Sequence, residues 1–274
     1  MTRTALIAGR GQLPRLLADA LTAAGEPFLV AELEGFASEV RGPAPIIFRL
    51  ERLVPFLDRL ADEGVTRVCF AGAVRRPRIE PELFDARTAS LVPRLVGALA
   101  GGDDATLRAI IGLFEEFGFQ VAGADLIAPD LVPGPGVLAG APTDADRVDA
   151  ARAAGIVEAL GGLDLGQGAV VAQGLCLAVE TLPGTDAMLA FVADHGARLR
   201  PDPNGAKGLL YKAPKPGQDR RVDLPTLGPD TVEAAHRAGL GGVVWQAGSV
   251  LLVDRAAMMA RAGELGLFLW SREP

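Results

Sequence analysis

The sequence is poor in the side chains that bind metals through nitrogen or sulfur. Its 274 residues include two histidines and two cysteines. This scarcity argues against a zinc site or a multi-histidine centre, which need several such ligands. Any metal chemistry must rest on carboxylates, which favour Mg²⁺ or Mn²⁺. Cys69 and Cys176 lie inside apolar runs, and we expect both to be buried free thiols in a reducing cytoplasm.

Excess positive charge and long apolar runs are lacking as well. The sequence has 27 Lys and Arg residues and 34 Asp and Glu residues, which gives a formal net charge of −7. This balance argues against nucleic-acid binding, which requires a positive surface. The mean hydropathy is high, +0.27, yet no window reaches about 18 uninterrupted apolar residues. The stretches 169–182 and 240–253 predict buried strands. No signal-peptide pattern follows Met1, so a cytoplasmic protein is expected.

The first half of the chain alternates strand-like and helix-like patterns. Strands are expected at 4–8, 27–32, 45–50, 67–74 and 119–122, and helices at 13–24, 52–63 and 87–117, with Gly101-Gly102 as a candidate break. Alternating strands and helices indicate a parallel sheet with helices on both faces. The sequence therefore predicts an α/β fold that begins with a Rossmann-like parallel-sheet domain.

Proline and glycine concentrate near the middle of the chain. Residues 129–142 contain four prolines and three glycines, which cannot continue a helix or a central strand. We therefore predict a domain at 1–130, a linker at 131–142 and a second domain at 143–274. Thr143 followed by Asp146 predicts a helix start. Later patterns predict helices at 144–160, 185–195, 229–238 and 255–265, with strands near 167–180, 208–213, 242–247, 249–253 and 267–270. The second domain is thus expected to be α/β with mixed strands.

A glycine-rich turn follows the first predicted strand. Gly9-Arg10-Gly11 leads from strand to helix, an arrangement that presents backbone N–H groups and a helix N-terminus to a phosphate. Pro14 replaces the third glycine of a dinucleotide-binding motif, and proline is well tolerated in a first helical turn. The pattern leaves a phosphate contact and a plain βα turn both open, and it disfavours NAD.

Two acidic motifs precede predicted helices. In Gly102-Asp103-Asp104 the carboxylates could be ligands, but a helix cap at Asp103 is the favoured interpretation. Gly184-Thr185-Asp186 could likewise be only a helix cap.

The strongest local signal lies at 212–223. These twelve residues contain four cations and two carboxylates, with prolines that restrict the backbone. A solvated surface loop is the usual explanation for such a charge cluster. The apolar segments on both sides favour a functional role instead. Lys and Arg suit phosphoryl oxygens, and Asp219 and Asp223 could bind Mg²⁺ or orient a water.

The whole chain resembles the LpxI-type UDP-2,3-diacylglucosamine pyrophosphatase family. The resemblance is carried by separate motifs in order: Ile7–Pro14, Gly72-Ala73-Val74, Gly102-Asp103-Asp104, Gln173-Gly174, Val179-Glu180, Gly184–Leu189, Lys212–Pro225 and Gly228. It implies Mg²⁺-dependent hydrolysis of UDP-2,3-diacylglucosamine to UMP and 2,3-diacylglucosamine 1-phosphate (lipid X) in lipid A biosynthesis. It also implies two domains with the lipid product held between them.

The resemblance also suggests site residues. Asp223 is the leading catalytic or metal-ligating residue, and Asp219 is the second. Expected phosphate or sugar contacts are Lys212, Lys215, Gln218 and Arg221. The rest of the substrate-binding set is Gly9, Arg10, Gly11, Gln12, Ala73, Asp103, Asp104, Thr185 and Asp186. A lipid substrate motivates the hypothesis of peripheral contact with the inner membrane, and a homodimer stays open.

Two alternatives come from other classes of protein. A non-catalytic nucleotide-sugar binding protein would share the linker and the Gly9–Gly11 turn, but it does not explain two carboxylates among phosphate-directed cations. An NAD(P) oxidoreductase would need the missing glycine and a ribose-binding acid, for which Glu32 or Glu34 is a weak candidate.

Overall fold

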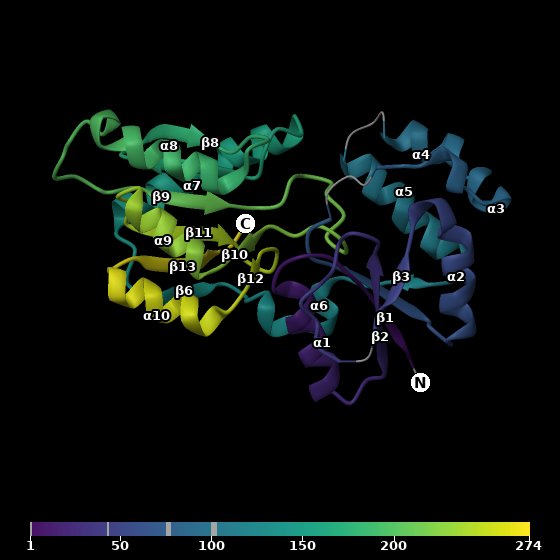
Figure 1. The fold of residues 1–274 in the computed structure, drawn as a ribbon. Coiled ribbons are helices and arrows are strands. Elements are labelled where there is room, and N and C mark those ends of the chain that lie inside the picture. Colours follow the sequence, from purple (N-terminus) through teal and green to yellow (C-terminus); the bar gives the residue numbers. More distant parts are fainter. Residues whose placement is uncertain (1, 43, 75–77, 100–102) are drawn as a thin grey trace. The chain divides into compact units, whose positions relative to one another are not determined.

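The computed structural model describes residues 2–42, 44–74, 78–99 and 103–274. Contacts divide the chain into two units, which Figure 1 colours along the sequence. Unit 1 comprises Met1–Pro129 and Asp219–Asp223, and unit 2 comprises Asp130–Gln218 and Leu224–Pro274. Residues 219–223, which the sequence prediction assigns to the second domain, therefore group with unit 1. The chain leaves unit 2 for these five residues and then returns to it.

Within the described residues, unit 1 is built on a five-stranded parallel sheet in the order β3-β2-β1-β4-β5. The strands are β1 (Thr4–Ala8), β2 (Phe28–Leu33), β3 (Ile46–Phe48), β4 (Arg67–Ala71) and β5 (Gln120–Val121). The helices are α1 (Leu13–Ala23), α2 (Leu53–Asp62), α3 (Ala86–Ala89), α4 (Val92–Leu99), α5 (Asp103–Glu116) and α6 (Ala124–Ile127). The predicted break at Gly101-Gly102 lies outside the described residues.

Helices cover both faces of this sheet, as the sequence predicted. Ala5 and Ile7 of β1 join a buried cluster with side chains of α2 and α5. Leu6 lies between them on the strand and is fully buried. Because successive strand residues point to opposite faces, Leu6 faces the other side, where α1 packs against β1 and β4. Figure 1 shows α1 and α2 on opposite sides of the sheet.

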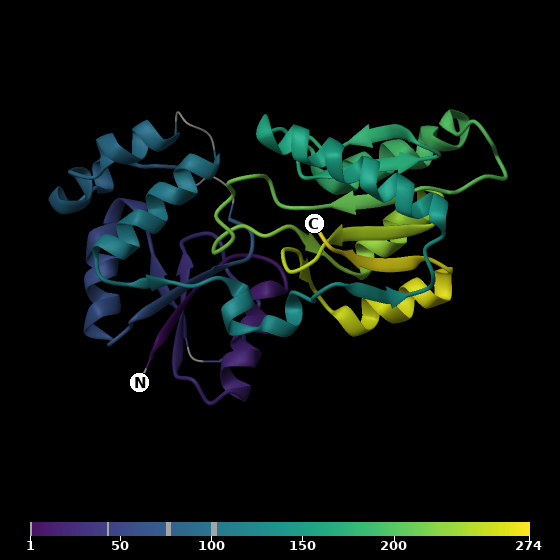
Figure 2. The same cartoon turned by 180° about the vertical axis from the view of Figure 1, so that it is seen from behind.

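Unit 2 contains, among its described residues, a six-stranded mixed sheet in the order β6-β13-β11-β9-β7-β8. Strands β9, β11 and β13 are parallel, and β6, β7 and β8 are antiparallel to their neighbours. The strands are β6 (Gly136–Ala139), β7 (Gly168–Ala172), β8 (Leu175–Val179), β9 (Leu209–Lys212), β11 (Gly242–Gln246) and β13 (Phe268–Arg272); β10 (Thr226–Leu227) pairs separately with β12 (Leu251–Leu252). The helices are α7 (Asp144–Gly162), α8 (Gly184–Leu199), α9 (Pro229–Arg237) and α10 (Arg255–Leu265). The predicted α/β fold class is confirmed in both units, and Figure 2 shows both sheets from behind.

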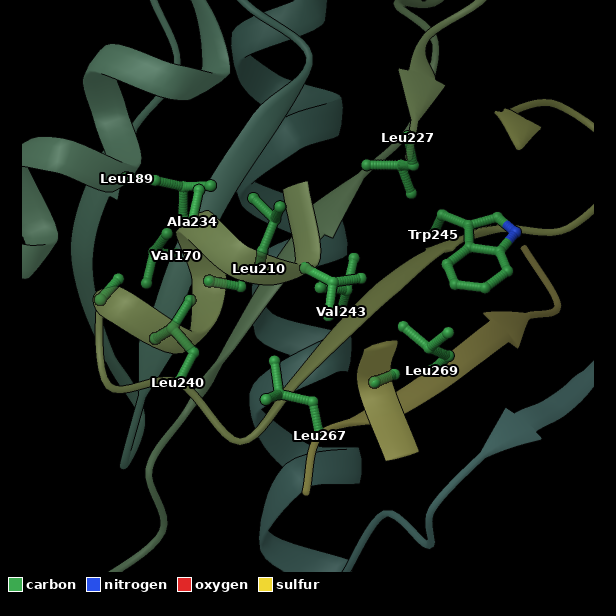
Figure 3. Close-up of a cluster of buried hydrophobic side chains, with 14 of the residues drawn as sticks. Val170, Leu189, Leu210, Leu227, Ala234, Leu240, Val243, Trp245, Leu267 and Leu269 are labelled. Carbon is green, nitrogen blue, oxygen red and sulfur yellow. The ribbon is translucent and has the colours of Figure 1, made fainter. Parts of the chain in front are cut away.

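The core of unit 2 lies on both faces of the mixed sheet. Val170 faces a cluster shared with α8, α9 and α10, which includes Trp245 (Figure 3). The neighbouring Ala169 and Val171 face a second cluster, shared with α7. A sheet covered on both faces has strands that are apolar throughout. This explains the apolar sequences of β7 and β11. The prediction is wrong for β8, which also lies in the stretch 169–182 but is partly exposed at the edge of the sheet.

A capping box opens the first helix of unit 2. The Thr143 hydroxyl accepts the Asp146 N–H at 3.3 Å, and the Asp146 carboxylate accepts the Thr143 N–H at 2.9 Å. The predicted helix start is confirmed. The preceding segment differs from prediction, because β6 lies inside the proposed linker at 131–142. It pairs at the edge of the sheet with β13, a position where flanking prolines are tolerated.

The two cysteines are both free thiols but lie in different surroundings. Cys69 on the inner strand β4 is fully buried, and this burial raises the pKa of its thiol to about 12. The prediction that Cys176 is buried is wrong: it is exposed on β8, an edge strand. Apolar neighbours in the sequence do not reveal that a strand lies at an edge. No helix in the described part of the chain has both the length and the apolar character needed to cross a membrane.

Candidate functional site

The first group of candidate residues lies in unit 1, where β1 and β4 end side by side. The strand order reverses at this pair, because β2 lies on one side of β1 and β4 on the other. Ligands of open parallel sheets bind beyond the carboxyl ends of the strands at such a point. Arg10 N donates to Ala73 O at 3.0 Å, and Ala73 N donates to Arg10 O at 2.9 Å. The structure thus brings together the Gly9–Gln12 turn and Ala73, as predicted from two distant motifs.

Glycines make this close approach of two loops feasible. A Cβ at Gly9 would lie 2.6 Å from Ala73 O, and one at Gly72 would lie 2.7 Å from Arg10 O. Gly72 also has φ +87°, a conformation that other residues rarely adopt. The glycines of both motifs therefore allow the two backbones to come into contact. This packing alone is a sufficient reason for glycine at these positions, and no ligand is needed to explain it.

The other residues of the turn lead into α1. Arg10 lies over the ring of Phe36, with its Cζ 5.8 Å from the ring centroid, and donates from Nη2 to Gly35 O at 3.4 Å. Gly11 has φ +97°. Gln12 is the N-cap residue of α1, and within the described structure its side chain makes no capping hydrogen bond. The first turn of α1 can therefore offer backbone N–H groups to an anion.

Both acids that could bind a ribose have partners inside unit 1. Glu32 is buried, and its Oε1 accepts from Ser38 N at 2.9 Å and from Ser38 Oγ at 2.6 Å. Glu34 forms an ion pair with Arg49. Each carboxylate thus has a structural partner, and the structure provides no support for a dinucleotide site.

The segment 219–223 forms a turn held by an ion-pair network, which we call the clamp (Glu115, Asp219 and Arg221). Arg221 Nη2 donates to Asp219 Oδ2 at 2.7 Å, and its Nη1 donates to Glu115 Oε1 on α5 at 2.6 Å. Asp219 Oδ1 also accepts the Arg221 backbone N–H at 3.1 Å. Hydrogen bonding to Arg221 holds the pKa of the Asp219 carboxyl below its usual value. Asp219 and Arg221, both predicted site residues, therefore bind each other.

Packing fixes the same turn against unit 1. Val222 packs against the buried cluster of α2 and α5. A Cβ at Gly123, the residue before α6, would lie 3.3 Å from the Arg221 Cα, so this glycine leaves room for the turn. Asp223 N donates to Asp219 O at 3.3 Å. The leading candidate for catalysis therefore sits on a turn that unit 1 holds by charge and by packing.

The acidic pair of the first half begins a helix. Asp103 and Asp104 are the first two residues of α5, and the interpretation of Asp103 as a helix cap stays a prediction. The preceding Gly102 lies outside the described residues.

The second group of candidate residues lies in unit 2, at the end of β9. Lys212 is its last residue and is only 6% exposed. Its Nζ donates to Thr185 Oγ1 on α8 at 2.6 Å and lies 3.7 Å from Glu180 Oε2. The Thr185 hydroxyl donates in turn to Glu180 Oε2 at 2.9 Å. We call these three residues the lysine cluster; it joins two predicted site residues to a third, Glu180, that the prediction did not assign.

The remaining candidates of unit 2 lie near this cluster in the sequence. Lys215 Nζ contacts Asp164 Oδ1 at 2.6 Å, and the Lys215 backbone N–H donates to Gln218 Oε1 at 2.9 Å. Asp186 is exposed in the first turn of α8, where a negative charge stabilises the helix dipole. Two lysines and a glutamine side-chain amide, from the end of β9 and the loop that follows it, can therefore donate to anionic oxygens.

The fold defines an α/β protein of two units. Its candidate sites contain a glycine-rich turn and partly buried lysines, which are features that proteins use to bind phosphorylated ligands. Two family descriptions match consecutive parts of the chain: the LpxI N-terminal domain matches residues 3–131, and the LpxI C-terminal domain matches residues 134–270. The chain is 42% identical over 277 residues to the UDP-2,3-diacylglucosamine pyrophosphatase LpxI of Caulobacter vibrioides, covering 100% of this chain and 99% of that protein. The chain belongs to the LpxI family.

A solved structure is also similar at a much lower level. The CobK precorrin-6A reductase matches with a TM-score of 0.33 and 16% identity, covering 100% of this chain and 90% of that one. A score this low supports no inference about activity.

Proposed function

We propose that this protein hydrolyses the pyrophosphate bond of UDP-2,3-diacylglucosamine, giving UMP and 2,3-diacylglucosamine 1-phosphate for lipid A biosynthesis. The observation that carries the proposal is the 42% identity to a pyrophosphatase of that name along the full length of both chains. Both LpxI domains match in order and without a large gap. The protein is therefore proposed to be a hydrolase acting on a phosphoric anhydride.

Hydrolysis of a pyrophosphate has two requirements. The negative oxygens must be neutralised, and a water must attack in line with the leaving group. In our proposal, Asp223 orients that water or takes its proton. The fixed turn that carries Asp223 supports this role, because a catalytic group must be held in place before the reaction. We assign Asp219 and Arg221 the task of holding this turn through the clamp.

Cations in unit 2 neutralise the phosphoryl oxygens in this proposal. Lys212 is suited to the task because it is buried, where an ammonium interacts strongly with an anion. Lys215 and Asp164 form a pair whose side chains are 26% and 57% exposed. Exposed pairs contribute only about 0–1 kcal/mol, so Lys215 can exchange Asp164 for a phosphate oxygen. In unit 2 the side-chain amide of Gln218 offers a further donor, and in unit 1 the Gly9–Gln12 turn offers backbone N–H groups.

Mg²⁺ is the cofactor that the family suggests, and the donor set limits how it could bind. Among the described residues, no three His, Cys, Asp or Glu side chains are grouped to hold a metal. Asp219 is bound by Arg221. Mg²⁺ commonly uses one or two carboxylates together with substrate phosphates and water, and Asp223 can supply one carboxylate. When bound there, Mg²⁺ would neutralise charge on the pyrophosphate.

Contact with a membrane surface is a further part of the proposal, because the substrate carries two acyl chains. Three leucines in two loops of unit 2 support it: Leu182 is 97% exposed, Leu163 71% and Leu165 51%. The loops are neighbours, since a Cβ at Gly166 would overlap Glu180 O. Co-sedimentation with phosphatidylglycerol vesicles tests this part, and absence of a bound fraction would contradict it.

The central experiment measures UMP released from UDP-2,3-diacylglucosamine, with Mg²⁺ and with EDTA. We expect release that EDTA abolishes. Asp223→Asn should lower kcat by at least about a thousandfold, the size of effect seen when a catalytic group is removed, while substrate still binds. Asp194→Asn, which changes an exposed carboxylate on α8, is the control and should retain activity. Binding without UMP release by the wild type would instead identify a nucleotide-sugar binding protein.

A further inference from the structure

Glu180 is a buried carboxylate to which the proposed reaction gives no role. It follows β8 and is 7% exposed. Its backbone N–H donates to Gly168 O at 2.8 Å, so the pairing of β8 with β7 fixes its position. A Cβ at Gly168 would lie 2.5 Å from Glu180 Oε2. A glycine on β7 thus leaves the space that this carboxylate occupies.

The carboxylate sets the direction of the Thr185 hydroxyl. Glu180 Oε2 accepts from Thr185 Oγ1 at 2.9 Å, and Lys212 Nζ donates to the same hydroxyl oxygen at 2.6 Å. A hydroxyl has one hydrogen. Because that hydrogen goes to Glu180, the lone pairs of the oxygen are directed to Lys212, and the ammonium is held at one place.

Glu180 also balances the charge of Lys212. The two side chains are 9% and 8% exposed, and the charged atoms lie 3.7 Å apart. A buried ammonium without an opposite charge is strongly disfavoured. The carboxylate therefore compensates the positive charge at the end of β9, where the two remaining hydrogens of the Lys212 ammonium can be donated to a ligand.

We propose that Glu180 is a positioning residue for the hydrolysis: together with Thr185, it balances the charge of Lys212 and holds this lysine in place to contact a phosphoryl oxygen of the substrate. The inference rests on the proposed function, in which Lys212 binds that oxygen. Glu180 acts through Lys212 and Thr185 and does not itself contact the substrate.

The variant Glu180→Gln tests the charge while keeping the shape. Its amide oxygen can still accept from Thr185, but the negative charge is lost. We expect kcat/KM of the folded enzyme for UMP release to fall about tenfold, the effect of losing one charge-assisted contact. The thermal midpoint should fall as well, because Lys212 is left buried without its opposite charge. Glu180→Asp keeps the charge and should recover part of the activity.

A matched control separates this effect from a general loss of stability. Asp149 is another buried carboxylate of unit 2, 2% exposed, and it accepts the N–H groups of Gln173 at 2.8 Å and Gly174 at 2.7 Å. Asp149→Asn should lower the thermal midpoint and leave kcat/KM of the folded enzyme unchanged. The reverse pattern for the two variants would overturn the proposal.

A double-mutant cycle tests whether Glu180 acts through Lys212. In a Lys212→Met background, Glu180→Gln should change kcat/KM by less than about twofold, since the charge that it serves is gone. Equal losses in both backgrounds would overturn the proposal. If Lys212→Met does not fold, Lys212→Gln provides the second background, because its amide can still donate to Thr185.

Failure of this proposal and failure of the proposed function give different results. An inactive wild type with UDP-2,3-diacylglucosamine contradicts the function itself. An active wild type together with a fully active Glu180→Gln variant contradicts only the role of Glu180.

Discussion

The two units build their candidate sites by different means. In unit 1, the Gly9 and Gly72 loops meet through backbone hydrogen bonds in places where a side chain would not fit. In unit 2, the lysine cluster is made of buried charges and a hydroxyl at the end of β9. The first arrangement offers N–H dipoles, and the second offers a full positive charge. Each kind of donor, taken by itself, suits the charged oxygens of a phosphorylated ligand.

This difference predicts different weaknesses. The unit 1 loops should be sensitive to added volume, because two backbones touch there. The lysine cluster should be sensitive to lost charge, because each of its ions has lost most of its water. Substitutions that add volume in the unit 1 loops, and substitutions that remove charge from the lysine cluster, therefore test this difference between the two units directly.

The largest effect is expected from Lys212→Met. Loss of one preorganised donor to transition-state charge typically costs about 10²–10³-fold in kcat. The substitution also leaves Glu180 buried without its cation, which costs about 3–5 kcal/mol of unfolding free energy. UMP release and urea unfolding measure the two effects.

The control for Lys212→Met is Lys207→Met, which changes an exposed lysine of the same unit. Both measurements should stay close to the wild type. If Lys212→Met behaved like Lys207→Met, the cluster would have no special dependence on charge, and the contrast with unit 1 would be lost.

A smaller effect is expected from Gly72→Ala in unit 1. The new Cβ would lie 2.7 Å from Arg10 O, at a residue with φ +87°. Overpacking of this kind costs about 1–3 kcal/mol, and thermal unfolding measures it. Gly25→Ala is the matched control. Gly25 has φ +66°, and a Cβ there would meet no described atom within 4 Å, so this variant carries only the backbone strain of about 1 kcal/mol. Equal losses for the two variants would show that the loops are not tightly packed.

Local patterns of the sequence were sufficient to predict much of the fold. The capping box of α7 and the Gly9–Gly11 turn depend on residues a few positions apart, so their spacing is visible in the chain. The mixed sheet of unit 2 was also predicted, because its strands are covered on both faces and read as apolar runs. Strand β6 was missed because edge pairing needs little apolar patterning.

Long-range arrangements could not be predicted in the same way. Glu180 approaches Lys212 only because β7 pairs with β8 on one side and β9 on the other, whereas α8 and its following loop separate the two residues in the sequence. The turn at 219–223 continues the charged stretch that begins at Lys212, yet its contacts group it with unit 1. The contacts that attach it to unit 1 include the pair of Arg221 with Glu115 on α5, and these two residues are separated by 106 positions.

The smallest effect is expected at the clamp, and it depends on pH. The pKa of Asp219 is lowered in the folded protein by hydrogen bonds from Arg221, so its carboxylate stabilises unit 1 above the unfolded-state pKa of about 3.9. This contribution is lost as the pH falls through the lower folded-state value. Asp219→Asn should cost about 1 kcal/mol at neutral pH, and its stability should change less with acid than that of the wild type. Urea unfolding between about pH 6 and pH 3 measures this change in stability.

The control is Glu116→Gln, which removes an exposed pair with Arg94. It should alter the acid dependence of stability less, because solvent screens that pair. If Asp219→Asn kept the full acid dependence of the wild type, the charge of Asp219 would play no part in holding the turn, and only the Arg221–Glu115 pair and the packing of Val222 would fix it to unit 1.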